Sequence, residues 1–190
     1  MCSVENPYGQ PFDDKANGSE PFEAVGDFTV PTLAGDWNFK WNWTGCDSYV
    51  FLVYHPDTKY ALAQQLWKSA SQLVFNYATQ NVHIFFMSYN PDASAIASEV
   101  GALKQEMDAA LAGQSKTTAA HWKYRLHYVT ANAFQLPNWI GATLKNKGVF
   151  YFGIDRLQRR RQFGLLKMPL SNSPYSLSFT NYETRYFNYE

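Results

Sequence analysis

The chain is poor in cysteine, with only Cys2 and Cys46 among its 190 residues. One pair of thiols cannot form the dense disulfide framework on which small secreted domains rely. Neither cysteine lies in a Cys-x-x-Cys pair, the arrangement that disulfide oxidoreductases use. The sequence therefore contains no recognisable site for thiol–disulfide exchange.

Long apolar runs and an excess of charge are also missing. No apolar segment approaches the ~20 residues that a membrane-spanning helix requires. Sixteen basic residues balance sixteen acidic ones, so no overall field favours nucleic acid or an anionic membrane. We therefore expect no nucleic-acid partner and no transmembrane segment.

Motifs for cofactors and metals are absent as well. The four histidines show no spacing typical of a zinc site. The sequence has no glycine-rich phosphate loop and no Gly-x-Ser-x-Gly elbow. We expect no cofactor and no metal. His83 and His127 fall within predicted strands, which favours buried core residues over ligands.

The length suits one domain with tails. Residues 1–24 are polar with glycine and proline, which predicts a flexible tether. The domain is expected at 25–166, and 167–190 form a C-terminal extension that leads into a further domain if the chain is part of a larger protein. Cys2 also fits lipid attachment, with an ordinary thiol or a disulfide as the alternatives. The predicted location is secreted, periplasmic or surface-tethered, with the cytoplasm as the alternative.

The order of apolar patterns predicts an α/β fold, with a mixed central sheet and helices on both faces. Residues 27–36 alternate and then turn, which is typical of an N-terminal hairpin. Buried strands are expected at 48–55, 82–89, 124–130, 149–154 and 159–165, and helices at 59–79, 96–111 and 136–144. A loop is expected at 114–118.

Large rings recur at every second position in Trp37, Phe39, Trp41 and Trp43. In a strand this spacing places all four on one face. One interpretation is core packing under the hairpin. The other is an exposed aromatic surface that binds a protein or a carbohydrate, because flat rings bury much area at low entropic cost.

Three segments together resemble the redoxin branch of the thioredoxin superfamily, the thiol–disulfide oxidoreductases and peroxiredoxins. Residues 27–35 resemble its opening hairpin, 48–65 its first buried strand and active-site helix, and 149–164 its late hairpin. The resemblance covers about 25–166 and implies a thioredoxin-like three-layer sandwich.

The departures from that family concern its chemistry. A redox member would carry Cys-x-x-Cys after the first buried strand, where this chain has Asp57-Thr-Lys-Tyr60. A peroxiredoxin would have Thr and Cys at the positions of Tyr60 and Ala63, and the family's cis-proline site is occupied by Lys147-Gly-Val149. The resemblance thus implies a redox-inactive binding or structural module and argues against an enzyme.

Two enzymatic alternatives stay open. Cys46 is the one candidate for a single-cysteine redoxin, although it precedes the buried strand and is expected at the end opposite the helix N-terminus. His55 and Asp57 flank Pro56 at the strand's carboxyl end, where open α/β sheets usually bind ligands. A His–Asp pair there suits acid–base catalysis without a thiol.

A short basic patch consists of Arg156, Arg159, Arg160 and Arg161. Such a patch binds phosphate groups when its side chains share a surface. The other interpretation is a solvated edge strand that uses charge to prevent sheet-to-sheet aggregation.

Overall fold

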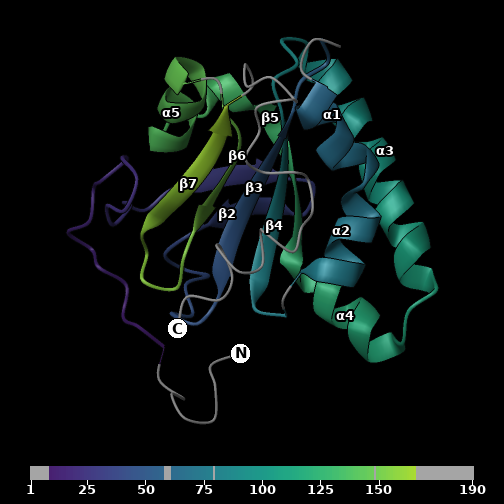
Figure 1. The fold of residues 1–190 in the computed structure, drawn as a ribbon, viewed down its shortest axis with the longest axis horizontal. Helices are drawn as coiled ribbons and strands as arrows, with labels where there is room; N and C mark the ends of the chain where they lie inside the picture. The colour runs from purple at the N-terminus through teal and green to yellow at the C-terminus, as the bar shows by residue number, and fades with distance from the viewer. Residues whose placement is uncertain (1–8, 58–60, 79, 148, 166–190) are drawn as a thin grey trace.

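The computed structural model describes residues 9–57, 61–78, 80–147 and 149–165 (Figure 1). Its strands are β1 (Thr29–Thr32), β2 (Gly35–Asn38), β3 (Ser48–Tyr54), β4 (Val82–Ser88), β5 (Leu126–Asn132), β6 (Val149–Ile154) and β7 (Arg160–Leu165). Its helices are α1 (Ala61–Lys68), α2 (Ala70–Tyr77), α3 (Ala93–Ala112), α4 (Lys116–Arg125) and α5 (Trp139–Lys147), with a 3-10 turn, η2, at Ala133–Gln135.

The strands form one mixed sheet in the order β2-β1-β5-β4-β3-β6-β7. β3 pairs with β4 in parallel, and so does β4 with β5. β6 lies antiparallel to β3 and to β7. Parallel neighbours need crossover connections, and the helices between β3, β4 and β5 provide them. The predicted mixed α/β sheet is confirmed.

Helices cover both faces of the sheet, as expected. On one face, the Trp67 indole of α1 donates to the Leu52 carbonyl at 3.3 Å and its ring meets Phe86 edge to face. On the other face, Trp139 of α5 lies 6.0 Å from Phe152, which stacks on Phe51 at 4.3 Å. Figure 1 shows α1 to α4 together on one side of the strands and α5 on the other.

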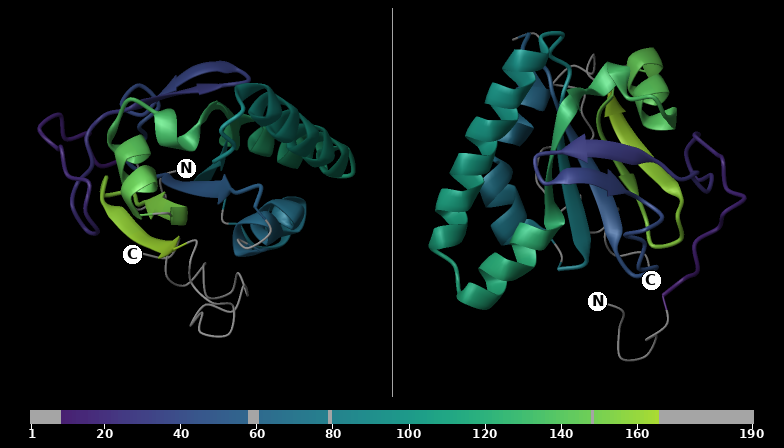
Figure 2. Two further views of the ribbon diagram at one scale, coloured as in Figure 1. Left: turned by 90° about the horizontal axis from the view of Figure 1, so that it is seen from above. Right: turned by 180° about the vertical axis from the view of Figure 1, so that it is seen from behind.

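The predicted N-terminal hairpin is also confirmed, and it curls over the face that carries α5. Its only paired position with β5 is Thr32 opposite Val129, and the Leu33 amide donates to the Tyr128 carbonyl at 2.9 Å. From there the hairpin crosses the sheet (Figure 2, right), so the Trp37 ring packs against Phe85 at 4.7 Å.

Two helix predictions need correction. The single helix expected at 59–79 is two helices separated at Ser69, although the Ser69 amide still donates to the Gln65 carbonyl. The loop expected at 114–118 contains the start of α4, which Ser115 caps by accepting from the Thr118 amide. The third strand consequently begins at Leu126, two residues later than expected.

The tether expected over residues 1–24 does not hold for residues 9–24, which pack on the domain. The Gln158 side chain donates to the Asp13 carbonyl at 3.1 Å and accepts from the Asp13 amide at 2.8 Å. Phe12 meets Phe39 edge to face at 5.5 Å. These contacts fix the segment because they use its backbone and one of its few large apolar side chains. Residues 1–8 and 166–190, including Cys2 and the C-terminal extension, lie outside the described residues.

Candidate functional site

The carboxyl end of β3 leads into His55 and Asp57, the pair considered for acid–base catalysis. Here the Asp57 amide donates to His55 Nδ1 at 3.1 Å, and Gln64 of α1 donates to the carbonyls of His55 and Pro56 at 3.2 and 3.0 Å. The His55 ring lies 5.7 Å from the ring of Tyr89. The bond that joins the two expected catalytic residues therefore uses the Asp57 backbone amide, whereas a His–Asp catalytic pair uses the carboxylate as acceptor.

Cys46 lies at the opposite end of β3, as expected from its place before that strand. It is disulfide-bonded and nearly buried, and its carbonyl accepts from the Asn81 side chain at 3.2 Å. The only other cysteine in the sequence is Cys2. A sulfur in a disulfide is no nucleophile until it is reduced, so the structural interpretation of Cys46 is the one that the geometry favours.

The segment from Trp37 to Trp43 is not one strand, because β2 ends at Asn38 and a turn follows. Trp37 and Phe39 are core residues with 8% and 0% exposure, whereas Trp41 is 86% exposed. Trp43 is partly buried, and its indole donates to the Gln10 carbonyl at 2.7 Å. The four rings therefore do not share a face, and Trp41 alone projects into solvent.

Side-chain hydrogen bonds hold the turn that presents Trp41. The Asn38 amide donates to both Asp27 carboxylate oxygens at 3.2 and 3.0 Å. The same carboxylate accepts from the Lys40 amide at 3.0 Å, and the Asn38 oxygen accepts from the Trp41 amide at 2.9 Å. Asn38 is buried and its bonds to Asp27 and Trp41 are partly buried, whereas the bond from the Lys40 amide is exposed. The exposed indole consequently stands on a fixed backbone.

The four arginines expected to form a basic patch do not share a surface. Arg160 is fully buried, donates to the Ser19 carbonyl and to Thr143 Oγ1, and has its pKa lowered by that burial. Arg161 forms an ion pair with the buried Asp155. Arg159 is exposed, and Arg156 and Arg161 are partly exposed. Side chains of β7 point alternately inward and outward, which divides the patch.

A buried polar cluster at the amino ends of the central strands was missed in the sequence. Arg125 donates to Asp47 Oδ1 at 3.0 Å, and His83 Nε2 lies 3.8 Å from Asp47 Oδ2. His83 Nδ1 and His127 Nε2 share a hydrogen bond of 2.9 Å with their rings stacked. The expectation that both histidines are core residues fits His83, which is 1% exposed, whereas His127 is partly exposed.

The cluster holds Asp47 charged and its histidines neutral. Burial alone would raise the pKa of Asp47, but the His83 imidazole 3.8 Å away, a hydrogen bond from the Thr44 hydroxyl and the charge of Arg125 bring it well below the usual range. Burial lowers the pKa of His83. Burial, then the charges of His83 and Arg125, lower the pKa of His127 to about 3.

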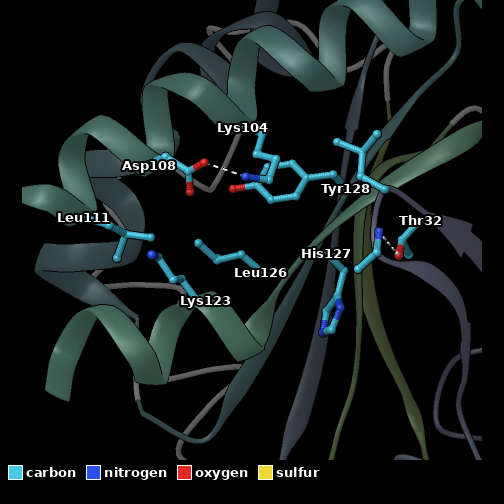
Figure 3. A pocket seen from close by; sticks show the side chains of 10 residues that line it. Thr32, Lys104, Asp108, Leu111, Lys123, Leu126, His127 and Tyr128 are labelled. Carbon is cyan, nitrogen blue, oxygen red and sulfur yellow. Dashed lines mark hydrogen bonds and ion pairs between the residues drawn. The ribbon is translucent and has the colours of Figure 1, made fainter. Parts of the chain in front are cut away.

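A cavity of about 310 Å³ opens where the β1–β2 turn approaches β5 and the helices α3 and α4 (Figure 3). Its lining combines apolar side chains, such as Leu111 and Leu126, with Lys104, Lys123 and the Tyr128 phenol. Within the described ranges, no three His, Cys, Asp or Glu side chains are arranged to hold a metal ion. No helix in that part of the chain is long and apolar enough to cross a membrane.

Comparison with known proteins finds structural likeness alone. No family model and no curated protein matches the chain. A hypothetical protein from Sinorhizobium meliloti 1021 has a TM-score of 0.50 at 13% sequence identity, with 90% of this chain and 84% of that chain covered. An uncharacterised conserved protein from Geobacillus kaustophilus has a TM-score of 0.49 at 12% identity, with 88% and 80% covered. The first likeness indicates a shared fold and carries no activity.

Proposed function

We propose that this chain is a redox-inactive, thioredoxin-like binding module. The support for the thioredoxin-like part is the order of elements. The N-terminal hairpin, the buried β3 followed by α1, and the late β6–β7 hairpin fall on the three segments whose sequences carry the resemblance. The β6–β7 hairpin continues the sheet beside β3, so the segments resembling the family's first strand and late hairpin are neighbours.

Redox inactivity is supported mainly by the position of Cys46, which lies at the opposite end of β3 from the N-terminus of α1. Thiol chemistry requires a thiolate, and the N-terminus of a helix is one of the places where the fold lowers a thiol's pKa. Cys46 precedes β3 and is disulfide-bonded, while His55, Pro56 and Asp57 follow that strand. Neither disulfide exchange nor peroxide reduction therefore has a nucleophile at the expected place.

The binding role rests on Trp41. A large ring with 86% exposure on a hydrogen-bonded turn offers apolar area whose backbone is already ordered before binding. Tryptophan is enriched among the side chains that dominate protein interfaces, and its flat face also stacks on sugars. The proposed partner is accordingly a protein or a carbohydrate.

The proposed location is an oxidising compartment, since disulfides persist outside the cytosol and are rare within it. Cys46 is disulfide-bonded and the chain has one other cysteine. Lipid attachment at Cys2 and an intramolecular disulfide at Cys46 therefore exclude each other. Mass spectrometry of the protein from its natural source, before and after reduction, distinguishes the two.

Enzyme assays test the proposal directly. Wild type and Cys46→Ser are compared in the reduction of insulin disulfides with dithiothreitol as electron donor, and in the consumption of hydrogen peroxide. Both proteins are expected to match the rate without protein. A rate above that background that disappears in Cys46→Ser would contradict redox inactivity and favour a single-cysteine redoxin.

A further inference from the structure

The lining of the cavity in Figure 3 comes from separate parts of the chain and includes neither Cys46 nor Trp41. Leu33 and Ala34 come from the β1–β2 turn, Leu111 from α3 and Leu126 from β5. The volume of about 310 Å³ is at the lower end of the range for small-molecule sites. Its apolar wall suits the body of a small organic molecule.

One cation at this cavity is uncompensated. Lys104 forms an ion pair with Asp108 one turn further along α3, so those two charges cancel. Lys123 of α4 also lines the cavity, and no ion pair joins it to another residue in the described part of the chain. Figure 3 shows Lys123 and the Lys104–Asp108 pair around the same hollow. The lining therefore carries a net charge of one positive unit.

A hydrogen-bond donor accompanies that cation. Tyr128 lines the cavity although its side chain is only 7% exposed. Burial, and then the negative charge of Asp108, raise the pKa of Tyr128, so the phenol keeps its proton at neutral pH. No hydrogen bond joins its hydroxyl to another group within the described residues. A buried ring with a protonated hydroxyl beside a cavity is available to donate to an acceptor there.

We propose that this cavity binds a small amphipathic carboxylate. Lys123 attracts the carboxylate, the Tyr128 hydroxyl donates to it, and Leu33, Leu111 and Leu126 contact the apolar body. A phosphate dianion fits less well, because the second lysine already has a carboxylate partner and phosphate sites usually supply several backbone amides or arginines. A neutral ligand would leave the Lys123 charge unused.

The test uses 3-phenylpropionate as the probe, with the neutral 3-phenylpropanamide and the cationic 3-phenylpropylamine as matched compounds. Binding is followed by amide chemical shifts of the full chain in NMR titrations. The carboxylate is expected to shift amides at Lys123, Leu126 and Tyr128 and to bind roughly tenfold more tightly than the amide. Lys123→Gln and Tyr128→Phe are each expected to weaken the carboxylate by about fivefold to tenfold.

Lys116→Gln is the matched control, because Lys116 lies on the same helix, is exposed and does not line the cavity. It removes the same charge and should leave affinity unchanged within about twofold. Three results would each overturn the proposal: equal binding of acid and amide, tighter binding of the amine, or no saturable shifts up to about 10 mM probe. An equal loss in Lys116→Gln and Lys123→Gln would also overturn it, because it would indicate attraction by net charge alone.

Discussion

Replacement of His127 by glutamine tests the buried polar cluster most directly. His127 shares its hydrogen bond with His83, stacks on Phe85 at 4.4 Å and packs beside Trp37 at 5.3 Å. Arg125 lies in the same cluster and opposes a second positive charge. The folded protein therefore resists protonation of this imidazole. Glutamine keeps a polar group that can bond to His83 but does not titrate.

The sign and size of the effect follow from linkage. The pKa of His127 is about 3 in the folded protein, against about 6.5 in an unfolded chain. The contribution of neutral His127 to the free energy of unfolding is fully present above about pH 6.5, the pKa in the unfolded chain. It falls as the pH drops from about 6.5 toward 3, because the unfolded state binds the proton first. At about pH 4 the loss reaches about 3 kcal/mol. His83 has a lowered pKa too, and it titrates in both proteins.

The measurement is urea unfolding of wild type and His127→Gln at about pH 7 and about pH 4. The wild type is expected to lose about 3 kcal/mol more between the two pH values than the variant does. Phe85→Leu is the control, since it disturbs the same stack without a titrating group. It should cost about 1 kcal/mol equally at both pH values. Equal pH-dependent losses in wild type and His127→Gln would refute the reasoning.

Three further predictions concern other residues. Asp47→Asn should destabilise the protein by about 3–5 kcal/mol in urea unfolding, because it leaves Arg125 buried without its partner; a loss below about 1 kcal/mol would contradict a buried ion pair. Because Cys46 is disulfide-bonded and the chain has two cysteines, thiol titration of the unfolded, unreduced protein should find no free thiol, and two after reduction. Trp41, at 86% exposure, should account for most of the fluorescence quenching by iodide, so Trp41→Phe should remove most of it; unchanged quenching would place that ring elsewhere.

The sequence predicted the elements whose packing leaves a local pattern. Strands β3 and β4 are continuous apolar runs because both faces of each are covered. Helix α3 buries Ile96, Val100, Leu103, Met107 and Leu111, which recur at helical spacing, and local residues mark its two ends, the Asp92 N-cap and Gly113. In each case the residues that are buried are the same residues that form the local pattern.

Helix α4 was missed because its burial leaves almost no pattern. Only Trp122 and Arg125 are buried on it, so no apolar stripe distinguishes it from a loop. The one local signal is Ser115, whose side chain accepts from the Thr118 amide, as an N-cap does. Burial of Arg125 depends on Asp47, which is 78 residues away in the sequence. No pattern within the helix sequence could therefore indicate it.

The burial or exposure of the aromatic residues from Trp37 to Trp43 also depends on a residue outside that segment. The alternation of rings from Trp37 to Trp43 is compatible with a strand and with a turn. The hydrogen-bond partner of the Asn38 side chain distinguishes the two. That partner is Asp27, eleven residues earlier, whose carboxylate binds the Asn38 side chain and the Lys40 amide. Because those bonds end the strand, Trp41 leaves the face that Trp37 occupies.

The buried charges of this domain lie at the opposite end of the sheet from His55 and Asp57. Asp47 precedes β3, Arg125 precedes β5 and His83 is the second residue of β4, so the cluster occupies the amino ends of the parallel strands. Ligands and catalytic residues of open α/β sheets belong to the carboxyl ends, where His55 and Asp57 lie. The contacts described between Asp47, Arg125 and the two strand histidines involve no residue of the carboxyl ends. Substitutions at the carboxyl end of β3 are therefore expected to leave the cluster intact, because its ion pair and hydrogen bonds lie at the other end of the strands.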